Sequence, residues 1–194
     1  QPAIMAVSMA IVRVLEAKGF SLAAEAKFVA GHSLGEYSAL CAAGALTLSD
    51  TAKLLKKRGQ AMQKAVSAGV GGMVALIGLD SKSADEIVQA AAEGEVCAVA
   101  NDNAPGQIVI SGHAAALERA IKIAAERGFK SIKLPVSAPF HCALMQPAAD
   151  AMREILKETV LKAPVVPVVA NVTAQAVSDP DTIRDLLVRQ VTGS

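Results

Sequence analysis

The stretch "AGHSLGEYSAL", residues 30–40, places a serine between two glycines in the pattern G-x-S-x-G. The run "AKFVA" before it predicts a short buried strand at 26–30, and "EYSALCAAGAL" after it predicts a small-residue helix. Ser33 therefore lies on a strand–turn–helix junction, the context of a nucleophile elbow, in which a sharp turn exposes the hydroxyl. Free N–H groups at the helix start, that of Leu34 first, suit an oxyanion. We favour a nucleophile at Ser33 over a purely structural glycine turn.

A serine nucleophile needs a base, and the chain has three histidines. The turn directs His32 away from the hydroxyl of Ser33, so lining of the pocket and ordinary packing beside the elbow fit it equally. His113 opens a predicted helix and fits a solvated position there. His141 lies in a proline-flanked loop, a rigid irregular segment of the kind that carries catalytic groups. From its position alone, a catalytic base and an ordinary loop histidine fit His141 equally.

Arg58 is an unexpected charge on the predicted helix 50–66. At 100° per residue it falls in the middle of the apolar arc, whereas the lysines of this helix lie on the opposite side. A buried guanidinium without a partner would cost several kcal/mol, so a carboxylate is expected nearby. The residues alone leave two partners open. One is an internal acid such as Glu36, which this reasoning favours, and the other is the carboxylate of a substrate.

The middle of the chain follows another pattern. Apolar runs and helical periods give the order strand, helix, strand, strand, helix, strand, which is a split β-α-β-β-α-β unit. We expect its strands at 73–79, 96–100, 107–111 and 130–136, its helices at 84–93 and 114–127, and a turn at 101–106. Ser83 with Glu86 fits a capping box for the first of these helices.

Few strands are expected outside this unit. Helices are predicted from Pro2 to Gly19, at 147–158 and at 181–191, but the strong core strands are only those at 26–30 and 165–170. Two strands are too few for a parallel sheet with both faces covered. We therefore expect the chain to be a segment of a longer one.

Composition excludes several classes of function. The 194 residues suit one domain or a domain with a smaller insert, and 19 Lys+Arg against 18 Asp+Glu give no basic field for nucleic acid. Three cysteines without a CxxC pair indicate neither a disulfide framework nor a zinc site, and they suit a reducing, cytoplasmic setting. Cys142 has no elbow around it and is interpreted as a buried thiol. The apolar start is stopped by Arg13 and Glu16, so we expect neither membrane insertion nor export.

Five ordered motifs carry a resemblance to a known family. They are "GHSLGEYSAL", "RGQAM" at 58–62, "NDNAPGQIVISG" at 101–112, "PVSAPFHCALM" at 135–145 and "PVVANVTA" at 167–174. Together they resemble the malonyl-CoA:acyl-carrier-protein transacylases of fatty acid synthesis, from Gln1 to about Val191. The resemblance implies an α/β fold with a hydrolase-like parallel-sheet core and an inserted ferredoxin-like βαββαβ subdomain. We place the incomplete core at 1–71 and 135–194, and the subdomain at 72–134.

The resemblance also implies roles for individual residues. Ser33 would be the acylated nucleophile, His141 its base, the N–H of Leu34 one oxyanion donor and Arg58 the clamp for the malonyl carboxylate. This overturns the preference for an internal partner of Arg58, and we add His32 to the substrate-binding residues as part of the pocket lining.

Two family elements are expected beyond the chain. One is a segment before Gln1 whose glutamine helps to form the oxyanion hole. The other is a segment after Ser194 whose backbone carbonyl orients the histidine.

The implied reaction moves a malonyl group from CoA to the phosphopantetheine thiol of acyl carrier protein. The expected partners are malonyl-CoA and acyl carrier protein, with no nucleic acid, membrane, metal or redox cofactor. An acyltransferase domain excised from a polyketide or animal-type fatty acid synthase remains a close alternative. An acyl hydrolase should lack an arginine at position 58, and a non-catalytic docking module would tolerate the loss of Ser33 or His141.

Overall fold

The computed structural model describes residues 1–136 and 138–193, so Ser137 of the "PVSAPFHCALM" motif lies outside the described residues. The chain forms two compact units. The first contains Gln1–Gln60 and Asp150–Gln190, and the second contains Ala61–Ala149 and the segment that follows Gln190. Helices and strands occur in both, which confirms the α/β class. No helix among the described residues is long and apolar enough to cross a membrane.

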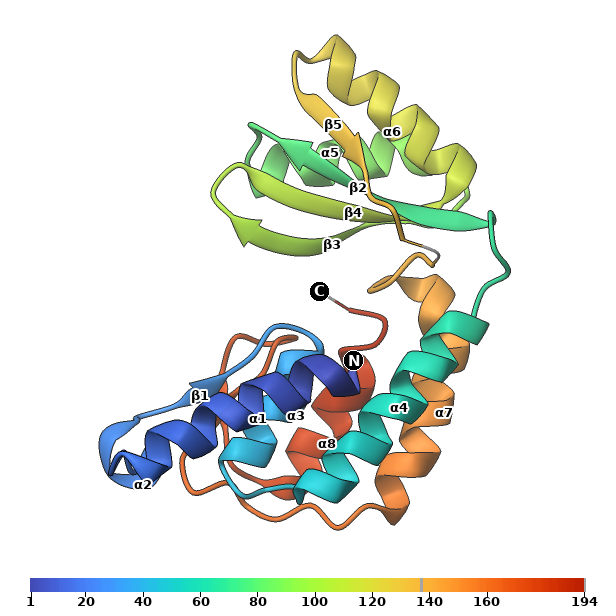
Figure 1. The fold of residues 1–194 in the computed structure, drawn as a ribbon. Coiled ribbons are helices and arrows are strands. Elements are labelled where there is room, and N and C mark those ends of the chain that lie inside the picture. Colours follow the sequence, from blue (N-terminus) through green and yellow to red (C-terminus); the bar gives the residue numbers. More distant parts are fainter. Residues whose placement is uncertain (137, 194) are drawn as a thin grey trace. The chain divides into compact units, whose positions relative to one another are not determined.

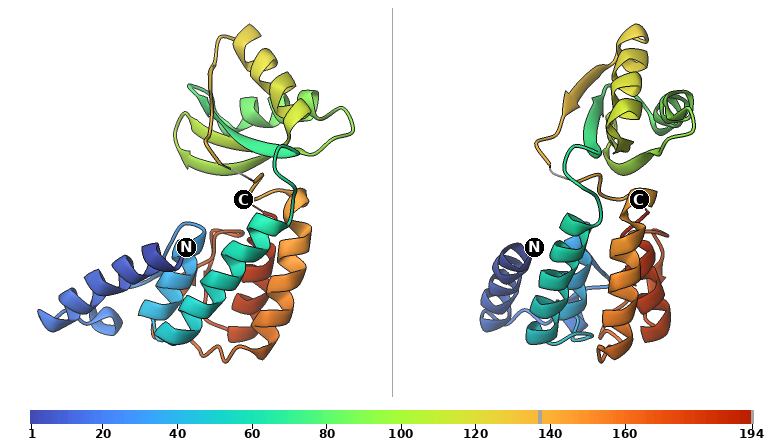
Figure 2. Two further views of the ribbon diagram at one scale, coloured as in Figure 1. Left: turned by 45° about the vertical axis from the view of Figure 1, so that its right-hand side comes forward. Right: turned by 90° about the vertical axis from the view of Figure 1, so that its right-hand side faces the viewer.

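The first unit is mainly helical (Figure 1). Its helices are α1 (Pro2–Ala17), α2 (Leu22–Glu25), α3 (Leu34–Ala42), α8 (Pro180–Arg189) and most of α4 (Leu48–Lys64) and α7 (Gln146–Glu158). The end of α7 is tied to α8 (Figure 2), because the guanidinium of Arg184 donates to the carbonyls of Leu156 and Thr159. The predicted helices are confirmed, with ends that differ by a few residues.

A small sheet supports the elbow in this unit. β1 (Val29–Ala30) pairs in parallel with β6 (Val168–Val169), and β6 pairs antiparallel with β7 (Ala176–Val177), which the sequence did not predict. Both predicted core strands therefore exist but are shorter than expected. Helix α3 packs on β1 and β6, and its residues from Glu36 to Cys41 are all buried.

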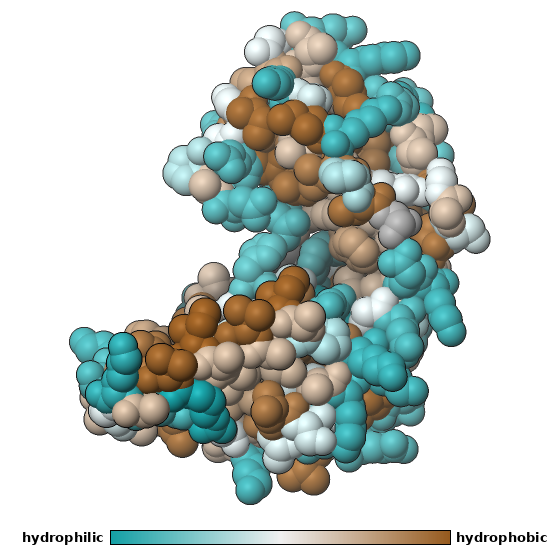
Figure 3. All heavy atoms as spheres, viewed as in Figure 1, coloured by the Kyte–Doolittle hydropathy of each residue, from teal (hydrophilic) through white to brown (hydrophobic). Residues whose placement is uncertain are grey.

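Helix α1 is apolar on the side away from the core. Its exposed apolar side chains recur at helical spacing and form a band along the helix in Figure 3: Ile4, Val7, Ile11 and Val14, which are 55 to 63% exposed. Met5 and Met9 face inward and are buried. This face has no apolar cover among the described residues.

The second unit contains a four-stranded antiparallel sheet in the order β3-β4-β2-β5. The elements follow the predicted order: β2 (Gly71–Ile77), α5 (Ser81–Ala92), β3 (Cys97–Ala104), β4 (Gln107–His113), α6 (Ala114–Glu126) and β5 (Lys130–Lys133). Both helices cover one face of the sheet (Figure 1), where Leu76, Ile87, Ile110 and Leu117 form part of a continuous core.

Two local predictions in this unit are wrong. The cap of α5 is Asp80, whose carboxylate accepts from the N–H of Ser83, so Ser83 lies inside the helix, and Glu86 instead pairs with Arg127. The predicted turn at 101–106 is mostly strand, since β3 continues to Ala104 through irregular pairing with β4. Asp, like Ser, is a favoured N-cap residue, and Asp80 caps the helix three residues before the predicted position.

Candidate active site

Ser33 lies at a strained turn between β1 and α3. It is the N-cap residue of α3 with φ 52° and ψ −109°, a backbone conformation that residues other than glycine rarely adopt. A Cβ at Gly31 would lie 2.0 Å from the carbonyl oxygen of Gly35, so only glycine fits there. No hydrogen bond within the described residues uses the N–H of Leu34, which opens α3. The geometry is that of the predicted elbow.

Two side chains from distant segments hold this turn. The Oδ1 of Asn171 accepts from the N–H of Ser33 at 2.7 Å, and the Nδ2 of Asn171 donates to the carbonyl of Gly31 at 2.8 Å. The Nε2 of Gln190 donates to the carbonyl of Ser33 at 3.0 Å. Asn171 follows β6 and Gln190 ends α8. These bonds stabilise a backbone that would otherwise relax, which is the condition for retaining strain at a site.

Arg58 is buried on α4, with 1% of its surface exposed, and its guanidinium faces Ser33. Its Nη2 donates to the Ser33 Oγ at 3.0 Å and to the Gln190 Oε1 at 2.9 Å, and its Nη1 donates to the Gln1 Oε1 at 2.9 Å. The guanidinium carbon lies 5.7 Å from the ring centre of Tyr37. Burial lowers the pKa of Arg58 below its usual value. The predicted position on the buried arc is confirmed.

The acidic partner favoured from the residues alone is not found. No Asp or Glu within the described ranges forms an ion pair with Arg58; its partners are neutral oxygens, and its Nε–H has no acceptor there. The expected internal pair between Arg58 and Glu36 is therefore wrong. A buried cation surrounded by neutral groups has capacity for an anion, because direct charge compensation is missing.

Glu36 is the buried carboxylate of the same network. It is 1% exposed, and its Oε2 accepts from the Gln190 Nε2 at 2.7 Å and from the N–H of Asn171 at 3.2 Å. Burial raises the pKa of Glu36, while these hydrogen bonds and the charge of Arg58 act in the opposite direction. The side-chain amide of Gln190 therefore links Glu36 to Arg58 by hydrogen bonds.

The raised pKa of Glu36 predicts a pH-dependent change in stability. Because the folded-state pKa lies above the usual 4.5, this carboxyl contributes stability below pH 4.5, and the contribution is lost as pH rises through the folded value. Glu36→Gln cannot titrate, so the variant should gain stability relative to the unmodified protein over that window. Urea unfolding from about pH 4 to about pH 8 measures the difference. Glu126→Gln, on the exposed side of α6, is the control. If the free energy of unfolding of Glu36→Gln depended on pH in the same way as that of the control, the prediction would be contradicted.

His141 belongs to the second unit and is described within it. It is 8% exposed, its φ is 58°, and its Nδ1 lies 3.2 Å from the carbonyl oxygen of Gly193. Since a carbonyl only accepts, the proton of the neutral ring is on Nδ1, which leaves Nε2 as the basic nitrogen. The orienting carbonyl expected beyond Ser194 has a counterpart within the chain, so that expectation needs correction.

The other candidate side chains have simpler surroundings. His32 is exposed at the turn, and its substrate-binding role stays a prediction. Cys142 is 1% exposed, its Sγ donates to the carbonyl of Pro139, and burial raises its pKa, as expected for a buried thiol. The prediction of a solvated His113 is wrong, because it is half-buried and its Nδ1 accepts from the N–H of Val96 at 2.9 Å.

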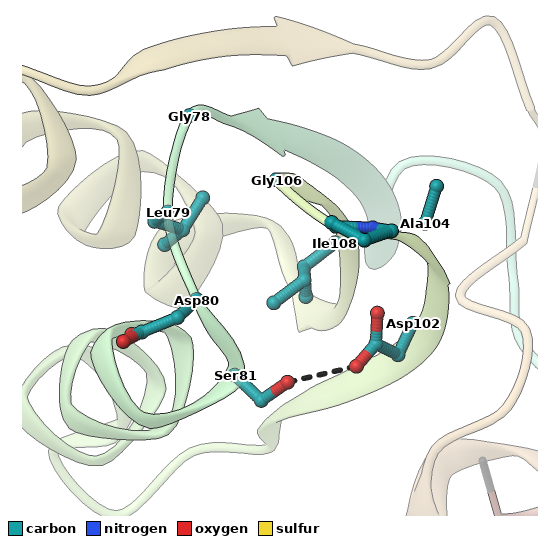
Figure 4. A pocket seen from close by; sticks show the side chains of 9 residues that line it. Gly78, Leu79, Asp80, Ser81, Asp102, Ala104, Gly106 and Ile108 are labelled. Carbon is teal, nitrogen blue, oxygen red and sulfur yellow. Dashed lines mark hydrogen bonds between the residues drawn. The ribbon is translucent and has the colours of Figure 1, made fainter.

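A surface hollow in the second unit offers a contrast (Figure 4). It lies where β2 leads into α5 and where β3 turns into β4, and none of the predicted site residues lines it. Its carboxylates serve local structure, since Asp102 accepts from the hydroxyl of Ser81 at 2.7 Å and Asp80 caps α5. No group of three or more His, Cys, Asp or Glu residues in the described ranges could hold a metal ion.

Sequence reasoning missed Asn171, Gln190 and Gln1. Gln190 had a usable signal, because it follows Ile183 and Leu186 at helical spacing and so falls on the buried arc of its helix, as Arg58 does. Asn171 lies within a quoted motif but in a loop without periodicity. Gln1 precedes a predicted helix and had no signal of its own.

Similarity to known proteins extends over nearly the whole chain. Residues 1–191 match the family model described as the acyl transferase domain. Curated malonyl CoA-acyl carrier protein transacylases from Salmonella typhimurium and Bacillus subtilis are 47% and 42% identical over 98% of this chain. The chain spans only 61% and 60% of their lengths.

Solved structures extend the similarity to three dimensions. The acyl-carrier-protein-S-malonyltransferase from Bartonella henselae is 57% identical with a TM-score of 0.96, and the match covers 99% of this chain and 62% of that one. A malonyl-transacylase solved in complex with a type II PKS acyl-carrier protein is 42% identical with a TM-score of 0.94, at 99% and 62% coverage.

Proposed function

The chain belongs to the acyl transferase domain family, and on this premise we propose that it transfers a malonyl group from malonyl-CoA to the phosphopantetheine thiol of acyl carrier protein. One observation carries the choice of acyl group. A buried guanidinium that contacts no carboxylate among the described residues lies 3.0 Å from the hydroxyl of Ser33. An acyl group on Ser33 that carries its own carboxylate would supply the missing charge, whereas acetyl would not.

The proposed reaction is ping-pong. The Oγ of Ser33 attacks the malonyl thioester carbon while the Nε2 of His141 takes the hydroxyl proton, and the N–H of Leu34 stabilises the oxyanion. The C–S bond then breaks, and the CoA sulfur receives the proton from His141. In the second half the carrier thiol gives a proton to His141 and attacks the acyl-serine, which restores the hydroxyl of Ser33.

Strain at Ser33 and the hydrogen bond to His141 support these roles. Residues with unusual backbone angles held by several hydrogen bonds cluster at catalytic turns, and Ser33 has this character. The contact with Gly193 selects the tautomer of His141 that a base requires. His32, exposed beside the elbow, is proposed to contact substrate. The chemistry needs no metal or redox cofactor.

The proposal includes a finer account of the fold. Residues 1–71 and 135–194 would form a hydrolase-like core, for which the parallel pairing of β1 with β6 and the elbow are the support. Residues 72–134 would form a ferredoxin-like subdomain, supported by the order β3-β4-β2-β5 with two helices on one face. A cytoplasmic location is proposed from the three free cysteines.

A transfer assay tests the function directly. The full-length protein is incubated with malonyl-CoA and holo acyl carrier protein, and malonyl carrier is measured by mass spectrometry. Release of free malonate without carrier acylation would indicate a hydrolase instead, and binding of the carrier without any acylation would indicate a docking module. Comparison of carriers from fatty acid and polyketide synthesis addresses the pathway.

His141→Ala should slow the acylation of Ser33 by about a hundredfold or more, the usual contribution of a positioned base. Quenched-flow single-turnover acylation by malonyl-CoA isolates this step. The control is His113→Ala, which removes a histidine whose contact is structural and should leave acylation near normal. Near-normal acylation in His141→Ala would show that His141 is an ordinary loop histidine and not the base.

A further inference from the structure

The side chain of Gln190 lies between those of Glu36 and Arg58 and forms hydrogen bonds with both. Its Oε1 accepts from the Arg58 Nη2 at 2.9 Å, and its Nε2 donates to the Glu36 Oε2 at 2.7 Å. All three side chains are 1% exposed. A buried cation and a buried carboxylate are thus linked through a neutral amide and do not touch.

The chemistry of the neighbours fixes which way this amide points. Its nitrogen faces three acceptors: the carboxylate of Glu36, the carbonyl of Ser33 and the Oδ1 of Asn171. Its oxygen faces a guanidinium that can only donate. Reversal of the amide would oppose like groups at both ends. The Gln190 Oε1 is therefore held against Arg58 by the groups that also hold the elbow.

Direct pairing would be the simpler way to satisfy both charges. A carboxylate in contact with Arg58 would compensate the guanidinium and would remove the cost of an isolated buried cation. Glutamate has nearly the same shape as glutamine, so such a pair needs no new space at position 190, and its cost is the lost hydrogen bond from the Gln190 Nε2 to the Ser33 carbonyl. The neutral amide gives up this stabilisation, a loss that proteins accept where function requires an unsatisfied group.

We propose that Gln190 is a specificity-determining residue that separates Glu36 from Arg58 and so reserves the guanidinium charge for the carboxylate of the acyl group. Gln190 also positions Arg58, because its Oε1 and the Ser33 Oγ accept from the same Nη2. This inference rests on the proposed malonyl transfer, and it adds how an internal acid is kept from competing with the substrate.

Two isosteric variants test it in the full-length protein. Gln190→Glu places a carboxylate against Arg58, with one proton shared between the introduced carboxyl group and that of Glu36. The double variant Glu36→Gln with Gln190→Glu moves the carboxylate to Arg58 without a change in total charge. In both, the ratio of kcat/KM for malonyl-CoA to that for acetyl-CoA should fall roughly a hundredfold. Both variants lose the amide donor to the Ser33 carbonyl, which slows malonyl and acetyl transfer alike, so the ratio and not either rate alone reports the charge at Arg58.

The ratio separates specificity from structural damage, because a disturbed elbow would slow both acyl groups alike. Gln89→Glu, the same change at an exposed position of α5, should leave both rates unchanged. A wild-type ratio in either folded glutamate variant would overturn the inference while leaving the proposed function intact. Failure of both to fold would also overturn it, because position 190 would then need its amide nitrogen as a donor to the elbow and not as a means of separating the charges. If the unmodified protein showed neither malonyl transfer nor a preference for malonyl over acetyl, the proposed function would be wrong, and the inference about Gln190 would be wrong with it.

Discussion

Replacement of Ser33 by alanine is expected to abolish the malonyl-enzyme adduct and to lower malonyl transfer by roughly 10⁴-fold or more. The substitution removes the oxygen that forms the acyl bond and leaves no other hydroxyl at the turn. Intact-mass analysis after exposure of the full-length protein to malonyl-CoA, with peptide mapping, detects the adduct. An adduct retained in Ser33→Ala, for example on Cys142, would end the serine hypothesis.

Ser38→Ala is the matched control for this experiment. Ser38 lies on the same helix as the elbow, and its buried hydroxyl has no hydrogen-bond partner among the described residues. Removal of an unsatisfied buried hydroxyl leaves no donor stranded, so the fold and the acylation should both persist. Loss of the adduct in Ser38→Ala as well would indicate that the assay reports damage to α3 and not the chemistry of Ser33.

The fold was predictable where local pattern and tertiary packing agree. The helix expected at 114–127 is α6 (Ala114–Glu126), because its apolar period matches the face that the sheet buries. The strands of the first unit were predicted less accurately. β1 and β6 contain two residues each and owe their existence to pairing across the chain, and β7 exists because β6 offers it an edge. A single sequence does not show those pairings.

The same contrast between local signals and long-range contacts holds for the candidate site. Arg58 was predicted as a buried charge from helical projection, and the turn at Ser33 from its glycines, because both signals are local. Their environment is not local. Asn171 holds Ser33 from 138 positions away, and Gln190 holds it from 157. The incorrect prediction of a direct pair between Glu36 and Arg58 has this cause, because the sequence pattern indicates two opposite charges near the elbow but not the amide of Gln190 between them.

Arg58→Ala should reduce the preference for malonyl over acetyl by roughly 10³-fold or more. The malonyl transition state loses a bidentate, charge-assisted contact, while acetyl no longer leaves a buried cation unpaired, so the two rates should converge. Single-turnover acylation of the full-length protein by malonyl-CoA and acetyl-CoA measures the ratio. Lys57→Ala, which removes the neighbouring cation on the exposed face of α4, should leave the ratio unchanged.

The stability of Arg58→Ala discriminates between the two possible partners of the guanidinium. Loss of one member of a buried ion pair costs about 3 to 5 kcal/mol, because the other charge is left stranded. In the described part of the chain, the partners of Arg58 are the neutral oxygens of Gln1, Ser33 and Gln190, so no contacting carboxylate there would be stranded. The free energy of unfolding should therefore change by less than that amount, since relief of the buried charge offsets part of the lost packing. A strongly destabilised variant that keeps its malonyl preference would show that Arg58 is a structural residue and that the acyl carboxylate is recognised elsewhere.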